Sequence, residues 1–547
     1  MPETPASVFI KQVELELRPL CVAANLAQWE GATTGTDDAL ARGVETETTL
    51  RTYLSSESRY LRIEDFLNES GDLDKLTRRQ LELLAIEHRP NQLAADVIDD
   101  LVRRSKKIEA EFRTFRATLD GREVTDNDII ALLRNEKDEG RRRAAWEASK
   151  QVAPRVADDL LELVTRRNEA ARSLGFRDFY AMQLTLQEID EGELLALFDD
   201  LRERTEGPFL EAKAEVDARV ARRFGIQSEE LRPWHYDDPF FQEPPLSGEV
   251  GLGAYFKGRD LLAIAARFFE GVGLPVDDVL ERSDLRERPG KDQHAYCTDI
   301  DREGDVRILC NIKDDDRWMG ILLHELGHAA YSKFTPVSLP WILRQPAHIA
   351  TTEAIALFMD RLLYDLDWLR DAAELELEDP LALQRRARQA HRFEMLLLAR
   401  WVLVMTFFER ELYANPDREH LDEHWWHLVE ELQGLRRPEG RKAPDWAAKI
   451  HLAVAPVYYH NYQLGELMAS QFEAALRTEA FDGLSPAGFV GRTELGDFLR
   501  ERIFLPGASI NWQALLRQAT GYELSADAFM EEVCPDPAIQ GGARSVQ

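Results

Sequence analysis

The chain has 547 residues, of which 44% are hydrophobic and 31% are charged, and its 99 acidic against 68 basic residues give a formal net charge of −31. A chain this apolar buries a substantial core and does not have the composition of a disordered protein. Its strong negative charge repels phosphate backbones, so we expect no nucleic-acid partner and an acidic, solubilising surface.

The sequence predicts a cytoplasmic protein that does not cross a membrane. The start, Met1-Pro-Glu-Thr-Pro-Ala-Ser, has no basic region followed by a long apolar run, as a secretory signal would. The most apolar window, 395–408, is too short for a bilayer and contains Arg400, which indicates a buried helix. The four cysteines form no CxxC pair and no disulfide framework in so long a chain, which favours free thiols in a reducing compartment.

Helical periodicity dominates the chain. Thr125 precedes Asp-Asn-Asp and an apolar run, which predicts a helix start. Between Leu186 and Leu201, apolar residues recur at helical spacings with acidic residues between them, which predicts one amphipathic helix. Further helical patterns cover residues 96–117, 259–271, 355–368, 386–413, 425–433 and 464–477.

Strand signals are few, and the fold class is therefore mainly α with a minor sheet. Residues 305–312 are β-branched and follow the turn Arg302-Glu-Gly-Asp, so we expect residues 293–300 and 305–312 to form a small hairpin. Two proline-containing stretches, 232–245 and 436–444, lack the composition of flexible linkers and are interpreted as ordered loops. We predict one domain over residues 1–534 and a disordered tail over 535–547.

The most informative motif is Ile321-Leu-Leu-His-Glu-Leu-Gly-His-Ala-Ala, on a helix expected at about 318–334. His324 and His328 are four residues apart, so on a helix their imidazoles share a face and can converge on one Zn²⁺ at about 2.0–2.1 Å. Glu325 is placed to take a proton from metal-bound water without being a ligand. The alternative is two core histidines bonded to the backbone, but in apolar surroundings one metal satisfies both imidazoles at once.

A catalytic zinc site needs a third protein ligand and one open position. Glu353 lies in a second apolar helical pattern, Ala347-His-Ile-Ala-Thr-Thr-Glu-Ala-Ile, where an unpaired carboxylate is costly. His348 competes for this role, although its place near a helix start favours capping or substrate contact. The remaining alternative for Glu353 is an ordinary glutamate paired with an arginine. We predict one zinc ion per chain, held by His324, His328 and Glu353.

His-Glu-Leu-Gly-His followed by a helical Glu-Ala-Ile resembles the glutamate-zincin peptidases. The chain is most similar to the angiotensin-converting enzyme (peptidyl-dipeptidase A) family, with the thimet oligopeptidase and oligoendopeptidase families as near relatives. Short segments in the same order extend the resemblance over nearly the whole chain; they begin at Phe9, Asn25, Phe268, His294, Arg307 and Ala448. The resemblance implies a bilobed, mostly helical gluzincin fold, a deep central cleft that admits short peptides, and a hairpin near the active site.

The resemblance also implies a set of substrate-binding residues. His294 and Ala295 resemble a segment at the edge of the cleft that hydrogen-bonds the substrate backbone. Lys449 resembles a lysine that holds the C-terminal carboxylate of the substrate, and a single lysine suits that task as a point charge. A glutamine that assists this lysine aligns with Arg259 here, which still suits a carboxylate. A solvated surface lysine is the alternative for Lys449.

Three further residues resemble catalytic groups of the family. Tyr459 and Tyr462 keep the spacing of its paired tyrosines, of which the second stabilises the oxyanion, and His451 resembles a histidine that contacts the scissile region. Tyr458 is the fallback because the alignment is offset by one residue. An aromatic helix face that packs on the core is the alternative for the tyrosines, and a hydrogen-bonded core histidine is the alternative for His451.

The chain departs from the family pattern at several positions. Leu357 stands where many relatives carry a carboxylate, so the group that orients a zinc histidine must come from elsewhere, with Asp360 one turn further on as the candidate. His460 and Asn461 replace an arginine between the tyrosines, which disfavours chloride activation there. Only Cys310 matches the disulfide beside the hairpin.

We therefore expect a zinc metallopeptidase that attacks short peptides with zinc-bound water and releases C-terminal dipeptides. One alternative is an oligoendopeptidase, which cuts inside short peptides and needs no free C-terminus. A more distant alternative is a non-catalytic peptide-binding protein, although such a relic would be expected to lose ligands. The expected partners are short peptides, with no nucleic acid and no membrane, and the chain is expected to act as a monomer or homodimer.

Overall fold

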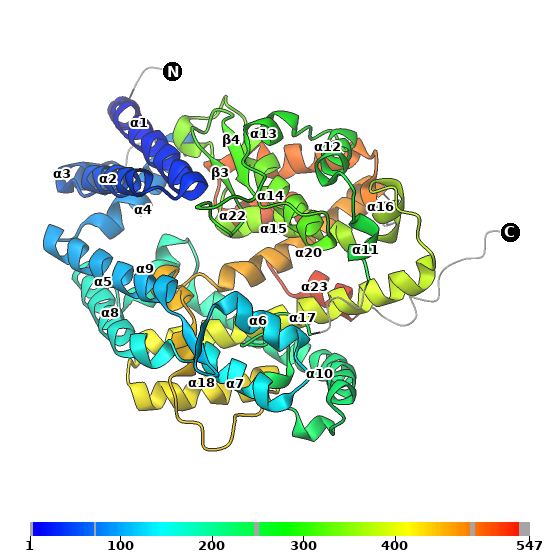
Figure 1. Ribbon diagram of the computed structural model, residues 1–547. Helices are drawn as coiled ribbons and strands as arrows, with labels where there is room; N and C mark the ends of the chain where they lie inside the picture. The colour runs from blue at the N-terminus through cyan, green and yellow to red at the C-terminus, as the bar shows by residue number, and fades with distance from the viewer. Residues whose placement is uncertain (1–3, 70–72, 246–250, 482–486, 535–547) are drawn as a thin grey trace. The chain divides into compact units, whose positions relative to one another are not determined.

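The structure is a computed structural model that describes residues 4–69, 73–245, 251–481 and 487–534 (Figure 1). The chain forms two compact units, each assembled from separate stretches. The first unit contains residues 1–92, 251–387 and 464–524; the second contains residues 93–250, 388–463 and 525–547. The tail predicted to be disordered, 535–547, lies outside the described residues.

Where the structure describes it, the first unit has helices and one hairpin. Its elements are α1 (Pro5–Thr34), α2 (Asp37–Leu54), α3 (Glu57–Asn68), α4 (Lys75–His88), α11 (Gly253–Phe256), α12 (Leu261–Gly271), α13 (Asp277–Arg282), β3 (Tyr296–Asp299), β4 (Val306–Leu309), α14 (Asp316–Phe334), α15 (Ile349–Asp360), α16 (Leu366–Asp371), α21 (Thr493–Phe498) and α22 (Trp512–Thr520).

The second unit is also mainly helical. Its elements are α5 (Ala95–Thr114), β1 (Ala117–Leu119), β2 (Arg122–Val124), α6 (Asp126–Asn135), α7 (Glu139–Ser149), α8 (Ala153–Ser173), α9 (Phe179–Leu186), α10 (Glu191–Phe224), α18 (Arg418–Gln433), α19 (His451–Val454) and α23 (Asp527–Val533). Two helices, α17 (Pro380–Ala414) and α20 (His460–Phe481), each contain one of the points at which the chain passes from one unit to the other.

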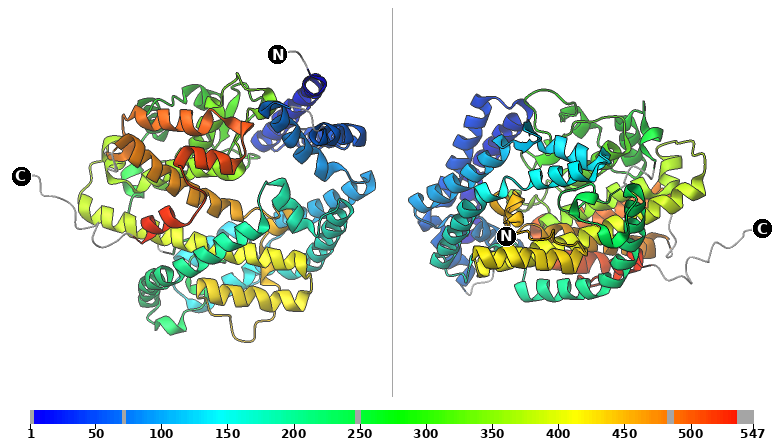
Figure 2. Two further views of the ribbon diagram at one scale, coloured as in Figure 1. Left: turned by 180° about the vertical axis from the view of Figure 1, so that it is seen from behind. Right: turned by 60° about the horizontal axis from the view of Figure 1, so that its bottom comes forward.

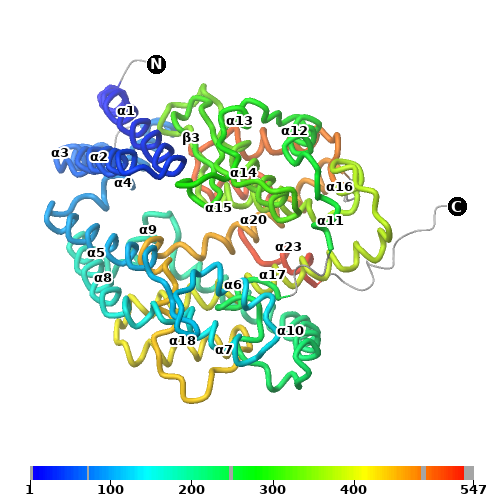
Figure 3. The backbone as a smooth tube through the Cα atoms, in the orientation of Figure 1, coloured from blue at the N-terminus to red at the C-terminus, as the bar shows by residue number. Residues whose placement is uncertain are grey.

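Each unit has its own apolar core. In the first, Ile10, Val13 and Leu17 fall on one face of α1 and pack with Leu81 and Leu84 of α4; α1 to α4 form the blue part of the trace in Figure 3. In the second, the neighbouring helices α17 and α18, both yellow in Figure 2, are joined by aromatic contacts such as Phe408 with Trp425.

The β3–β4 hairpin confirms the predicted one in a shorter form and packs on α14. The strands are antiparallel, with Tyr296 opposite Leu309 and Asp299 opposite Val306. Asp284 forms a bridge with Leu309, so β4 has neighbours on both sides. Among the described residues, no strand pairs with the outer edge of β3.

Most predicted helices are confirmed. Thr125 caps α6, where its hydroxyl accepts from the Asp128 N–H at 3.2 Å. The apolar window 395–408 is a buried part of α17, and the charge of Arg400 is satisfied by the carbonyls of Leu432 and Arg202. In the described part of the chain, no helix has both the length and the apolar character that a bilayer crossing needs.

Three predicted helix boundaries are wrong. The helix expected between Leu186 and Leu201 is two helices, because the chain turns at Glu188 (φ 54°) and Asp190 begins α10 as its cap. The pattern 355–368 is interrupted after α15 by a 3₁₀ turn over Arg361–Tyr364. The pattern 96–117 ends at Thr114, and a small antiparallel hairpin, β1–β2, follows it.

Candidate metal centre and active site

The helix α14 carries both motif histidines. It begins at Asp315, whose side chain accepts from the Trp318 N–H at 2.8 Å, and it spans residues 316–334, close to the predicted 318–334. Most of its apolar residues are buried. His324 and His328 lie on one face with ring centroids 5.0 Å apart, as their spacing of four predicts.

The neighbouring helix α15 approaches α14 closely at Gly327. A Cβ at Gly327 would lie 2.7 Å from Cα of Ala356, so only glycine fits at this crossing. The first residue before α15 is His348, whose Nδ1 accepts from the Ala350 N–H at 3.0 Å. The capping role considered for His348 is thus confirmed, and the same helix brings Glu353 to the histidines.

The three predicted ligands meet in this structure. Their candidate ligand atoms, one from each residue, all lie within 4.8 Å of one another. Oε2 of Glu353 is 3.7 Å from Nε2 of His324 and 3.9 Å from Nε2 of His328. Ligands about 2.0–2.1 Å from a tetrahedral zinc stand about 3.4 Å apart, so the two distances from Glu353 to the histidines exceed that spacing by only about 0.3 and 0.5 Å.

The other nitrogen of each imidazole has its own partner. Nδ1 of His324 lies 2.9 Å from Oδ2 of Asp360, the candidate orienting carboxylate, and Nδ1 of His328 lies 2.7 Å from Oγ1 of Thr352. These bonds leave the two Nε2 atoms facing Glu353, as a metal site requires. The sequence did not predict Thr352 as a partner of His328. The feature that could have indicated it is its position directly before Glu353.

Glu325 faces the same region without an assigned partner. Its side chain is buried, and its Oε2 has no hydrogen-bond partner among the described residues. Burial, which disfavours the charged carboxylate, raises the pKa of Glu325 to about 7. A buried carboxylate with an unsatisfied oxygen is costly in a purely structural role, so the arrangement suits a group that handles a proton.

The charges around the histidines fit a divalent cation. Burial opposes the protonation of His324, but the hydrogen bond to Asp360 and the nearby carboxylates of Glu353 and Glu325 raise its pKa to about 9. Burial lowers the pKa of His328 to about 3, which keeps that imidazole neutral. Two imidazoles and a carboxylate form the donor set typical of zinc hydrolases, and a bound cation would offset the excess negative charge.

The helix α20 packs against the third ligand, Glu353. A Cβ on Gly465 would lie 2.9 Å from Cβ of Glu353, so glycine is needed for this approach. One residue later, Glu466 forms a buried ion pair with Arg361, which also donates to Oγ of Ser470 at 3.2 Å. Because Arg361 directly follows α15, these contacts fix the end of the helix that supplies the ligand and its orienting carboxylate.

The predicted substrate-backbone segment leads into β3. His294 is exposed, and its N–H donates to Oδ1 of Asp292 at 3.0 Å. Ala295 is half-buried and directly precedes Tyr296, the first residue of β3. The sheet packs on α14, in the unit that carries the metal ligands, and no described strand pairs with the outer edge of β3. At the end of β3, the Asp299 carbonyl accepts from Nδ2 of Asn25 at 3.2 Å.

Lys449 belongs to the second unit, and the structure places a glutamine beside it. Its Nζ donates to Oε1 of Gln242 at 2.6 Å and lies 5.2 Å from the ring centroids of Phe240 and Trp401. Burial lowers the pKa of Lys449 to about 8. Gln242 was missed because it is 207 residues earlier in the chain and no local pattern marks it.

Arg259 belongs to the first unit. Its guanidinium donates to the carbonyl oxygens of Ala373 and Glu374, so at least part of its donor capacity serves the fold. Its predicted role in substrate binding stays a prediction. The side-chain amide that the structure places beside Lys449 belongs to Gln242.

The histidine and tyrosines predicted to be catalytic are neighbours in the second unit. The ring of Tyr459 is 5.1 Å from that of His451 and 5.6 Å from that of Tyr462, between ring centroids. Tyr458, the fallback, also touches Tyr462, at 5.3 Å. The structure therefore brings these residues together, while their roles in a reaction stay predictions.

The turn before these tyrosines contains a strained residue that the sequence analysis missed. Val457 has φ 55°, which is rare for a β-branched residue. Its N–H donates to the buried Glu409 at 2.8 Å, and its carbonyl accepts from Gln187 at 3.0 Å. Gln187 also accepts from Nδ2 of Asn461 at 2.8 Å.

Comparison with known families gives one match. The model of the peptidase family M2, described as angiotensin-converting enzyme, matches residues 1–225 and 253–535. The comparison with curated proteins returned no match.

Proposed function

This chain belongs to the angiotensin-converting enzyme family of peptidases, and we propose that it is a zinc-dependent enzyme that hydrolyses short peptides and releases dipeptides from their C-terminus. The cluster of His324, His328 and Glu353 next to the buried Glu325 carries the first part of this proposal. The surroundings of Lys449 carry the second part.

The residues around the cluster have separate tasks. His324, His328 and Glu353 hold the ion, which when bound polarises the scissile carbonyl and makes water acidic near neutral pH. Glu325 accepts the proton of the attacking water and passes it to the leaving amine. Asp360 keeps His324 oriented throughout.

The oxyanion is assigned to Tyr462, with help from His451. A tyrosine hydroxyl donates a hydrogen bond without placing another charge in the site, and loss of one such donor costs roughly 10²–10³-fold in rate. Tyr462 is three residues before Gly465 on α20, the helix that packs against Glu353. This position in the chain supports Tyr462, with Tyr459 as its ring partner.

The outer edge of β3 supports the substrate backbone. An extended peptide can add to an exposed strand edge through main-chain hydrogen bonds, which bind any sequence. Ala295 supplies the first main-chain groups of this edge. Short, unstructured peptides are the substrates that such an edge selects, because a folded protein does not present an isolated strand.

The preference for a free C-terminus depends on Lys449. Its ammonium is buried, and among the described residues it forms no ion pair; its polar partner is the neutral amide of Gln242. The carboxylates of Asp238 and Glu243 act on this ammonium electrostatically but form no ion pair with it. A buried ammonium with no direct anionic partner suits an anionic ligand. The C-terminal carboxylate of a peptide supplies that charge, with Gln242 as a second hydrogen-bonding group.

Mass spectrometry of the products from a mixed peptide library, with and without a chelator, tests the proposal. We expect dipeptide products that disappear when the metal is removed. Equal hydrolysis of free-acid and C-terminally amidated peptides would indicate an oligoendopeptidase, and no chelator-sensitive hydrolysis at all would indicate a binding protein.

The four free cysteines support a reducing, cytoplasmic location.

A further inference from the structure

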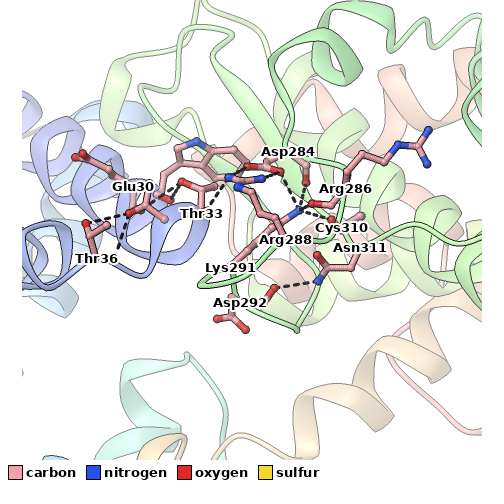
Figure 4. Close-up of polar contacts among 12 residues, drawn as sticks. Glu30, Thr33, Thr36, Asp284, Arg286, Arg288, Lys291, Asp292, Cys310 and Asn311 are labelled. Carbon is pink, nitrogen blue, oxygen red and sulfur yellow. Dashed lines mark hydrogen bonds and ion pairs between the residues drawn. The ribbon is translucent and has the colours of Figure 1, made fainter.

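A buried lysine fixes the loop that leads into β3. The side chain of Lys291 has no exposed surface, and its Nζ donates to the carbonyls of Asp284 and Arg286 at 2.9 Å each and to the carbonyl of Cys310 (Figure 4). Oδ1 of Asp284 lies 2.9 Å from the same nitrogen. Burial of an ammonium is tolerated here because all its donors are used.

These bonds join two segments that are distant in the sequence. Asp284 and Arg286 belong to the loop after α13, whereas Cys310 follows β4. A main-chain hydrogen bond joins the same two segments, because the Cys310 N–H donates to the Asp284 carbonyl at 2.9 Å. The carboxylate of Asp284 is held by Arg288 and Lys291 together. Burial opposes its ionisation, but the bonds to these two cations lower its pKa and keep it charged.

The residue after Lys291 is anchored from two further sides. The Asp292 N–H donates to the Ala32 carbonyl, in the last turn of α1, at 2.8 Å. The Asp292 carbonyl accepts from Nδ2 of Asn311 at 2.9 Å, a contact that Figure 4 also shows. Asn311 is 2% exposed, so this amide is a rigid support.

The anchored segment therefore enters β3 from a fixed point. Only Gln293, His294 and Ala295 separate Asp292 from the first residue of the strand. A peptide that pairs with an edge strand needs the N–H and C=O groups of that edge to point outward. If the backbone of the edge is already ordered, binding costs less conformational entropy. A loop that is free to move would have to be ordered by each incoming peptide.

We propose that Lys291 is a positioning residue for peptide binding: through Asp284 and Cys310 it holds the loop over residues 292–295, which leads into the edge strand β3, in the place where the substrate backbone binds. This inference rests on the proposed function. Lys291 then acts in peptide binding and takes no part in the chemical step, because its ammonium donates all its hydrogen bonds to groups of the protein.

The test compares the full-length, metal-loaded protein with Lys291→Met, which keeps the length of the side chain and removes its charge. Lys313→Met is the matched control, since that lysine is largely exposed and pairs only loosely with Glu287 of the same loop at 3.4 Å. Asn311→Ala removes the second anchor and serves if the first variant does not fold. Each protein is examined for zinc content, peptide kinetics and hydrogen–deuterium exchange.

For Lys291→Met we expect KM for free-acid peptides to rise about tenfold while kcat changes less than about twofold. Amides 292–298 should exchange faster, with those of α14 unchanged and zinc content equal to wild type. Asn311→Ala should move both quantities in the same direction, and Lys313→Met should move neither. Unchanged KM and unchanged exchange in a folded Lys291→Met protein would overturn the proposal, as would equal losses in kcat and zinc content.

The peptide kinetics distinguish a failure of this inference from a failure of the proposed function. If the wild-type protein hydrolyses no peptide, the proposed function fails, and the role of Lys291 in substrate binding fails with it even where exchange near β3 accelerates. If the wild-type protein hydrolyses peptides and Lys291→Met does so with the same KM, only the inference about Lys291 fails.

Discussion

Oδ2 of Asp360 lies 2.9 Å from Nδ1 of His324. Asp360 is the last residue of α15, seven positions after Glu353, so both carboxylates lie on one face of the helix, about two turns apart. One helix thus supplies a ligand and the group that orients another ligand. The carboxylate expected to come from elsewhere than Leu357 is thus found three residues later, at the end of α15.

Replacing Asp360 by Asn should weaken zinc binding about 10–100-fold, because the imidazole of His324 loses the acceptor that sets its tautomer and its direction. Competition with a chromophoric chelator measures this change. Asp367→Asn is the matched control, since Asp367 is half-exposed and pairs with Arg370 at 2.9 Å. Wild-type zinc affinity in Asp360→Asn would show that Asp360 does not orient the ligand.

Local geometry explains which parts of the site the sequence could predict. The spacing of His324 and His328 fixes their common face on any helix, and Glu353 stands out as a carboxylate in an apolar helix. Asp360 follows from the same helical repeat. Gln242 could not be found in this way, because its contact with Lys449 depends on how distant segments fold together.

The errors in the fold have equally local causes. Apolar residues continue at helical spacing through the turn between α9 and α10, so periodicity alone does not show the break there. The sequence does contain a signal, because Asp190 stands three residues before Glu193 and accepts from its N–H at 2.9 Å. The missed β1–β2 hairpin has Asp120-Gly121 at its turn, a pair that favours positive φ at both positions.

Replacing Glu325 by Gln should leave zinc content and peptide binding intact and reduce kcat about 10²–10⁴-fold. The amide keeps the shape of the side chain but cannot accept the proton of water. Single-turnover kinetics and a peptide-binding titration on the same zinc-loaded preparation separate the two effects. Full activity in this variant would refute the assignment of the base.

Replacing Gly327 by Ala should destabilise the protein by about 1–3 kcal/mol, because the added methyl group overlaps Ala356 where α14 crosses α15. It should also lower zinc affinity, since the crossing sets the distance from Glu353 to the histidines. Gly43→Ala in α2 is the control. Beyond the adjacent backbone of its own helix, no atom lies within 4 Å of its added Cβ, so that variant should be more stable by about 0.4–1 kcal/mol.

Thermal and denaturant unfolding of both glycine variants, with zinc removed and with zinc bound, measures these changes. The two variants differ from wild type by the same atoms and belong to helices of the same unit. If Gly327→Ala were as stable as Gly43→Ala, the close crossing of α14 and α15 would not constrain the site.

The preference for a free C-terminus should depend on pH. Burial lowers the pKa of Lys449 to about 8, so the ammonium that attracts a carboxylate is mostly charged at pH 7 and mostly neutral at pH 9. The ratio of kcat/KM for a free-acid peptide to that for its amide should therefore fall about tenfold over this range. Groups that affect both substrates, Glu325 among them, cancel in the ratio. Lys449→Met should bring the ratio close to one at every pH, and a constant, high ratio in that variant would show that another group binds the carboxylate.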